Sequence, residues 1–176
     1  MAMSDRNGSR QSGISRQQGT VVDDAATPPS EWAVRRPHLA RGRSATDRAA
    51  AACLYAGIAL SRAELVPREG AARAANGVRL SRQALAELAK NAPDPAADAR
   101  GARNAAAAAA VAAQEARSHG GASELSEAAY RSAIKASQAA GAAAGSAGLG
   151  RDETLNAEAD AAEAAAVATA LEAGWM

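Results

Sequence analysis

Residues 94–121 read DPAADARGARNAAAAAAVAAQEARSHGG. Asp94 is an acidic residue of the kind that caps helix N-termini, and Pro95 follows at the first helical position, where no amide hydrogen is missed. At the other end, His119 stands in the last turn before two glycines, a combination that is typical of a helix C-terminus. These two boundaries are the clearest in the chain. They predict one long helix from residue 95 to residues 119–121.

The rest of the chain shows similar helix signals on both sides of this stretch. Ser44 and Asp47 resemble a capping box, and the apolar stripe that follows stops before Pro67. We expect four further helices, over about 45–65, about 68–91, from 123 to the glycines that begin at 141, and from about 152 to the residues just before Gly174. Each connection is too short for a long crossover. The sequence therefore predicts an all-α fold, an alanine-rich antiparallel bundle of about five helices over residues 44–176.

The composition predicts a thin apolar core. Of 176 residues, 55 are alanine, and the chain has two tryptophans, two tyrosines and no phenylalanine. Alanine buries little surface, and burial stabilises by only about 25 cal/mol per Å². Strand formers are scarce and do not alternate with polar residues, which excludes a β domain. We expect folding to be marginal alone and helped by a second subunit or a partner. The excess of alanine, glycine and arginine indicates a GC-rich, bacterial genome.

Residues 1–43 differ from the remainder. They are rich in serine, glutamine, glycine, arginine, aspartate and proline, and their few apolar residues show no period. Such a segment cannot bury enough surface to offset the entropy lost on ordering. We therefore predict a disordered basic arm, residues 1–43, before the helical domain. Trp32 either docks on the bundle or anchors a partner, and docking is the favoured interpretation.

A basic stretch lies around the end of this arm. It consists of Arg35, Arg36, Arg41, Arg43 and Arg48. Flexible positive charge of this kind is able to bind nucleic acid or an anionic surface, which makes residues 35–48 the basis of an alternative function. The aromatic platform of a single-strand binder is missing, however, and residues 122–176 carry eight acidic against three basic residues. We therefore favour contact between these arginines and the acidic C-terminal helix, within the chain or between subunits.

The sequence offers no catalytic, cofactor or metal site. A single cysteine, Cys53, excludes an intrachain disulfide and a zinc site of its own, and we expect a small buried residue there. Glu115 and His119 lie four residues apart on one helix face, but two ligands do not make a metal site. A metal-dependent helical-bundle enzyme is thus the weakest hypothesis. No nucleotide-binding or hydrolase motif is present.

The sequence also lacks targeting signals. No apolar run approaches the ~20 residues that cross a bilayer, and the first 30 residues have no hydrophobic region. The Arg35–Arg36 pair faintly resembles a twin-arginine export signal, but no cleavage site follows it. A cytoplasmic location is the expectation.

A ridge of small residues marks the fourth predicted helix. Ser137, Gly141 and Gly145 lie on one face, which must be covered by the fifth helix or by a partner. We therefore predict a non-enzymatic protein that acts through protein–protein contact, by self-association or with an obligate partner, in a toxin-neutralising, accessory or scaffold role. The expected contact residues are Trp32, Arg35, Arg36, Arg41, Arg43, Ser137, Gly141, Gly145 and Trp175.

Overall fold

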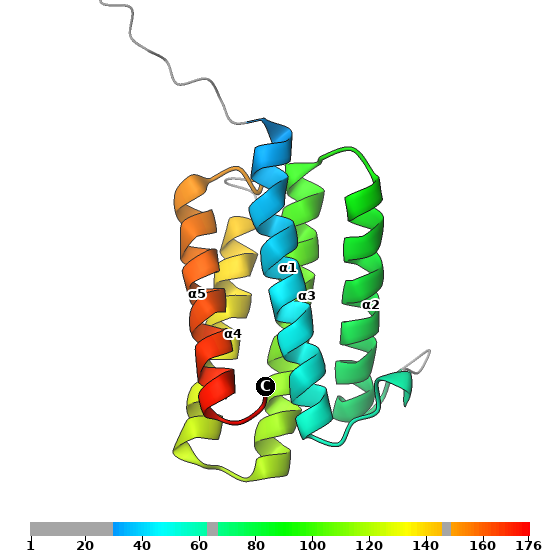
Figure 1. The fold of residues 1–176 in the computed structure, drawn as a ribbon, viewed down its shortest axis with the longest axis vertical. Coiled ribbons are helices and arrows are strands. Elements are labelled where there is room, and N and C mark those ends of the chain that lie inside the picture. Colours follow the sequence, from blue (N-terminus) through cyan, green and yellow to red (C-terminus); the bar gives the residue numbers. More distant parts are fainter. Residues whose placement is uncertain (1–29, 63–66, 146–148) are drawn as a thin grey trace, which may run out of the picture.

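The computed structural model describes residues 30–62, 67–145 and 149–176. It contains α1 (Glu31–Tyr55), the short 3-10 helix η1 (Leu60–Arg62), α2 (Gly70–Lys90), α3 (Pro95–Gly120), α4 (Glu124–Ala143) and α5 (Glu153–Glu172). Consecutive α-helices run in opposite directions (Figure 1), and the described ranges contain no strand. The predicted all-α, alanine-rich antiparallel bundle is confirmed.

Side-chain caps set the helix ends where the sequence predicted them. The Asp94 carboxylate accepts hydrogen bonds from the amides of Ala96 and Ala97, at 3.0 and 3.1 Å. Ser123 and Asp152 likewise accept from backbone amides at the starts of α4 and α5. These bonds satisfy amide hydrogens that have no partner within the helix.

The first helix departs from the prediction. We expected an arm through residue 43 and a helix over about 45–65, but α1 begins at Glu31 and ends at Tyr55. The prediction was wrong because it relied on apolar periodicity, whereas the N-terminal half of α1 turns polar side chains toward the bundle. Residues 1–29 lie outside the described part of the chain, and so does their predicted disorder.

The helices form two layers, with α5, α1 and α2 in front and α4 and α3 behind (Figure 1). α1 lies between α5 and α2 and packs most extensively along α3, while α4 packs against α3 and α5. Among the elements that the structure describes, α2 contacts only α1, α3 and η1, and α5 contacts only α4 and α1. These two helices therefore stand at opposite edges of the bundle. Across the described ranges, no helix combines the length and hydropathy that crossing a membrane requires.

The core consists largely of methyl groups. Alanine supplies most of the buried apolar side chains, and the larger ones are few: Leu39, Cys53, Ile58, Val78, Leu85 and Trp175. The helix backbones approach each other closely instead of being separated by large side chains. A Cβ atom on Gly42 of α1 would lie 3.4 Å from the Cα of Ala102 in α3. Small side chains thus bring the helix axes together and spread the contact over many residues.

Enlarging this core tests the close approach. Ala49 of α1 is fully buried, so we expect Ala49→Leu to lower the free energy of unfolding by about 1–3 kcal/mol through overpacking. The matched control is Ala40→Leu, on the exposed side of the same helix, which should change it little. Chemical denaturation followed by circular dichroism measures the stability of both variants. Equal denaturation midpoints would show that the core accommodates a larger side chain at Ala49 without overpacking.

Candidate functional site

One face of α1 carries a row of polar side chains that point into the bundle. The row consists of Arg35, His38, Arg41, Ser44 and Arg48. Residues three or four positions apart share one face of a helix. All but Ser44 are nearly fully buried, so each needs partners on neighbouring elements.

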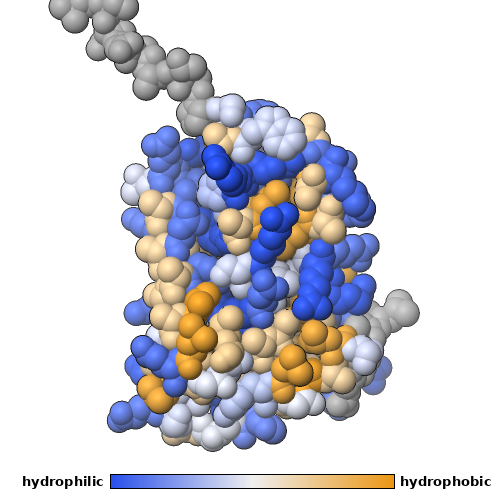
Figure 2. All heavy atoms as spheres, viewed as in Figure 1, coloured by the Kyte–Doolittle hydropathy of each residue, from blue (hydrophilic) through white to orange (hydrophobic). Residues whose placement is uncertain are grey.

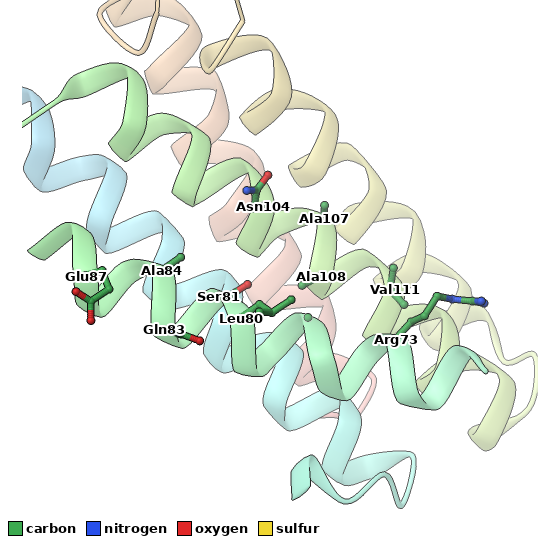
Figure 3. Close-up of a pocket in the computed structure, with 11 residues that line it drawn as sticks. Arg73, Leu80, Ser81, Gln83, Ala84, Glu87, Asn104, Ala107, Ala108 and Val111 are labelled. Carbon is green, nitrogen blue, oxygen red and sulfur yellow. The ribbon is translucent and has the colours of Figure 1, made fainter. Parts of the chain in front are cut away.

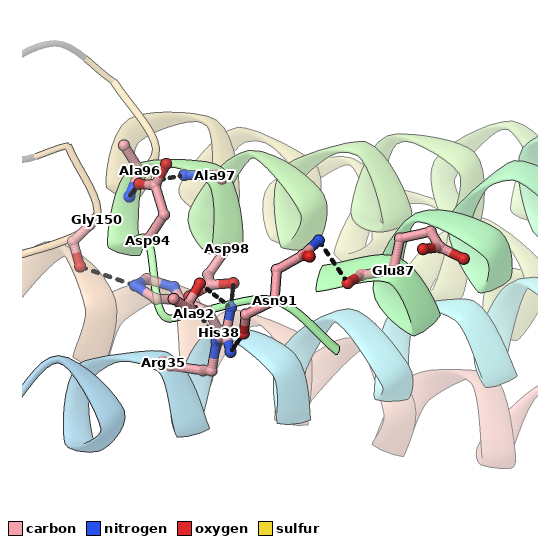
Figure 4. A network of polar contacts seen from close by, with 10 residues as sticks. All are labelled: Arg35, His38, Glu87, Asn91, Ala92, Asp94, Ala96, Ala97, Asp98 and Gly150. Carbon is pink, nitrogen blue, oxygen red and sulfur yellow. Dashed lines mark hydrogen bonds and ion pairs between the residues drawn. The ribbon is translucent and has the colours of Figure 1, made fainter. Parts of the chain in front are cut away.

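Arg35 joins α1 to the turn between α2 and α3 (Figure 4). Its guanidinium donates to both carboxylate oxygens of Asp98, at 3.0 and 3.1 Å, and the Asp98 side chain is fully buried. It also donates to the backbone carbonyls of Asn91 and Ala92, at 2.7 and 3.0 Å. This two-pronged geometry is the strongest form of a charged hydrogen bond. The first turns of α1 are held to α3 by this pair.

His38 links α1 to the segment before α5. Its Nε2 donates to the carbonyl of Gly150 at 2.8 Å, and its Nδ1 accepts from Nη2 of Arg41 at 2.9 Å. An arginine has no acceptor, so the Nδ1 lone pair is occupied and the imidazole is neutral. Burial lowers the pKa of His38 below its ordinary value, and the adjacent charge of Arg41 acts in the same direction. The Gly150 hydrogen bond, Asp98 and Asp160 oppose this shift.

The remaining arginines of the row pair with α5. Arg41 donates to Asp160 at 2.5 Å and to the backbone and side-chain oxygens of Asn156, both at 3.1 Å; its Nε alone finds no acceptor in the described part of the chain. Arg48 donates to both carboxylate oxygens of Glu163, which also accepts from Ser44. The predicted contact between the basic stretch and the acidic C-terminal helix is therefore present within the chain for Arg41 and Arg48.

The other predicted contact residues are divided between interior and surface. Arg35, Arg41 and Trp175 are at most 4% exposed and are engaged inside the bundle, Trp175 beside the ring of Tyr55. The same side chains complete the protein's own packing, and their contact with a partner chain stays a prediction. Arg36 and Arg43 are exposed.

Trp32 does not dock on the body of the bundle. Its side chain is 64% exposed on the first turn of α1, with the guanidinium of Arg35 5.4 Å from the ring centre. The favoured interpretation of Trp32 was therefore wrong: it contacts its own helix and leaves most of the ring in solvent.

The predicted small-residue ridge lies beside the packed face of α4. Ser137, Gly141 and Gly145 are half-buried, and a Cβ atom added to Gly141 would meet nothing within 4 Å. α4 instead packs through the neighbouring alanines Ala133, Ala136 and Ala140. α5 therefore leaves the ridge uncovered at Gly141.

The side chains with reactive potential in the described ranges include Cys53 and His119. Burial raises the pKa of Cys53 to about 11, so its thiol stays protonated at neutral pH. His119 packs edge-on against Tyr55, with ring centres 5.9 Å apart. Among the residues that the structure describes, no three histidine, cysteine or acidic side chains gather where they could hold a metal ion.

A groove between α2 and α3 hollows the surface, and sequence reasoning missed it (Figure 3). Its volume is about 680 Å³. It is lined by Arg73, Gly77, Leu80, Ser81, Gln83, Ala84 and Glu87 of α2 and by Asn104, Ala107, Ala108 and Val111 of α3. Leu80 is 53% exposed. We call this feature the α2–α3 groove.

The sequence held only a weak signal for the groove. Arg73, Gly77, Leu80, Ala84 and Glu87 follow one another at intervals of four and three residues, so they share a face of α2. Only Leu80 among them is a large apolar residue, and the stripe that packs into the core is more apolar. A pattern search therefore selects the core stripe alone.

Comparison with known proteins adds no relative. The chain matches no protein-family model, no curated protein and no solved structure. The candidate sites therefore rest on the chain's own geometry.

Removing one partner of the buried pair tests the role of Arg35. Asp98→Asn leaves the guanidinium buried without a countercharge, and we expect a loss of about 3–5 kcal/mol in the free energy of unfolding. The control is Glu31→Gln, which removes the exposed partner of Arg151 and should cost less than about 1 kcal/mol. Urea denaturation of both variants measures the difference, and similar losses would contradict the assignment.

The environment of His38 predicts acid sensitivity. Its pKa is lowered from 6.5 in the folded protein, so the unfolded chain binds a proton that the folded chain does not, and stability falls as pH drops below that value. We expect His38→Gln to flatten this dependence, which has a slope of at most about 1.4 kcal/mol per pH unit for one group.

Denaturation from about pH 7.5 to about pH 5.5 covers the ordinary histidine range. His119→Gln is the matched control, because it removes a histidine that is exposed. If His119→Gln flattened the dependence and His38→Gln did not, His38 would not be its source.

Proposed function

We propose that this protein is non-enzymatic and acts by contact with another protein chain, one of whose α-helices lies in the α2–α3 groove. The observation that carries the proposal is the groove itself: a channel along two helices, lined in part by glycine, serine and alanine, with a half-exposed leucine in it.

The walls of the groove have the spacing that a docked helix requires. The α2 wall repeats at intervals of four and three residues, the spacing of seams between packed helices. A Cβ atom on Gly77 would lie 2.7 Å from the Cβ of Ala108, so α2 and α3 nearly touch beneath the groove. Ala84 and Ala107 line the groove with short side chains, so its walls are shallow. A third helix is able to approach closely and to cover Leu80.

Energetics support the same proposal. The core consists mainly of alanine, so the bundle gains little stability from each buried side chain. A partner helix that binds the folded state and not the unfolded chain buries further apolar surface. Its binding stabilises the folded state by mass action. This agrees with the expectation of self-association or an obligate partner.

The proposal that the protein is non-enzymatic rests on the burial and protonation state of its reactive side chains. His38 is sealed between Gly150 and Arg41, and the pKa of Cys53 is raised to about 11. Neither lines the α2–α3 groove. Toxin-neutralising, accessory and scaffold roles all use contact of this kind.

The alternative function, binding of nucleic acid or an anionic surface through residues 35–48, has weaker support. Arg35, Arg41 and Arg48 are ion-paired inside the chain. Arg36 and Arg43 are exposed, and two such charges supply little of the phosphate contact on which this binding depends.

A cytoplasmic location in a bacterium belongs to the same proposal. Cys53 is a buried free thiol, the state expected in a reducing compartment. The bacterial source is supported by the composition, which is rich in alanine, arginine and glycine.

Photo-crosslinking in cells of the native host tests the proposed contact. A photo-reactive amino acid replaces Ala84, which is exposed and lines the groove, and the expected product is a covalent adduct with a protein chain. The same replacement at Ala142, exposed on α4, is the matched control and should give little adduct. No protein adduct at position 84, or a nucleic-acid adduct in its place, would overturn the proposal.

A further inference from the structure

The edge of the bundle opposite α2 carries a helix face that no other described part of the chain covers. α5 buries only Ala159, Glu163, Ala166 and Ala170 against its neighbours. Its outer face shows a second stripe at intervals of four, three, four and three residues, and every member is exposed: Ala157, Ala161, Ala164, Ala168 and Leu171. Figure 2 shows pale orange residues down this edge of the molecule and stronger orange at its lower end. We call this face the α5 stripe.

The α5 stripe matches the α2–α3 groove in length and in shape. Residues 73 to 87 along the groove and residues 157 to 171 along the stripe each cover about 21 Å of helix. Both follow the same alternation of four and three residues. A helix whose contact face carries mainly methyl groups is able to approach another helix closely. This suits the α2–α3 groove, which is shallow because α2 and α3 meet beneath it at Gly77 and Ala108. Leu80 and Leu171 are the large apolar side chains of the two surfaces.

The two surfaces also carry opposite charges. Arg73 lines the groove, and Arg100 and Arg103 are exposed on α3, where Arg103 donates to the groove residue Asn104. Glu87 is the carboxylate that lines the groove, and it already pairs with Lys90 at 2.9 Å. α5 has no basic residue, and Glu158 and Glu172 lie exposed next to the stripe. Complementary charge of this kind steers association and fixes the partner's orientation.

We infer that the helix that occupies the α2–α3 groove is α5 of a second copy of this chain. The inference rests on the proposed function and names its partner. Because α2 and α5 stand at opposite edges of the bundle (Figure 1), a chain cannot place its own α5 in its own groove. Each contact therefore leaves one groove and one stripe free, and copies add head to tail into a ring or an open chain.

Two blocking substitutions test the head-to-tail contact. Ala84→Trp fills the groove, and Ala164→Trp interrupts the α5 stripe; both positions are exposed, so unfolding temperatures should stay close to that of the native protein. We expect sedimentation velocity to show self-association of the native chain, with each variant weaker by about ten-fold or more, as for a residue at the centre of an interface. Added salt should weaken the association, because it screens the opposite charges. Ala142→Trp is the matched control and should associate like the native chain.

Mixing the two variants separates head-to-tail contact from a symmetric one. The Ala84→Trp protein keeps its stripe and the Ala164→Trp protein keeps its groove, so the mixture should form a one-to-one dimer and stop there. Failure of the mixture to dimerise while both variants are folded would overturn the inference, as would a native chain that stays monomeric at high micromolar concentration.

The photo-crosslink at position 84 distinguishes the two levels of the proposal. Mass spectrometry of the adduct, with the two copies carrying different isotopes, should find a peptide from residues 153–172 of the other copy. An adduct with a different protein, or with residues 1–29 of this chain, would overturn the inference; the first would leave the proposed function standing. The absence of any protein adduct would overturn both.

Discussion

A buried guanidinium is tolerated only where a carboxylate and further acceptors surround it, and α1 carries three of them, at Arg35, Arg41 and Arg48. Their partners lie on α3 and α5 and in the turn after α2. These contacts place α1 at the centre of the bundle. Each buried guanidinium needs its own carboxylate at a fixed place on the neighbouring helix, so the row also fixes the register of α1 against its neighbours. Contacts between alanine side chains alone would specify this register only weakly.

The arrangement at Gly150 extends this constraint to the connection before α5. Its carbonyl oxygen accepts from both His38 and the side chain of Asn156, at 2.8 and 2.9 Å. A Cβ atom at this position would collide with the carbonyl of Pro95, and its φ angle is +81°. Glycine is the residue that suits both demands. The Gly150 carbonyl thereby joins α1 and α5, and the same residue lies against the first turn of α3.

The sequence predicted the helices where local chemistry decides them. Asp94, Ser123 and Asp152 cap helices that begin within one residue of the expected positions. The start of α1 escaped prediction because Arg35, His38 and Arg41 face the interior, and a pattern search assigns polar residues to solvent. The pairing of Arg41 and Arg48 with α5 followed from net charge along the chain. The identity of the residues that pair, and the groove between α2 and α3, required the three-dimensional arrangement.

The alanine-rich interior also limits which substitutions the core tolerates. The commonest damage to a protein core is the loss of volume, when a large side chain is replaced by a smaller one. Where alanine already fills the contact, only glycine is smaller, and it costs a helix about 1 kcal/mol in propensity. Substitution in this interior therefore runs almost entirely toward larger residues, so the spacing between the helices sets an upper limit on side-chain size along most of α1 and α3.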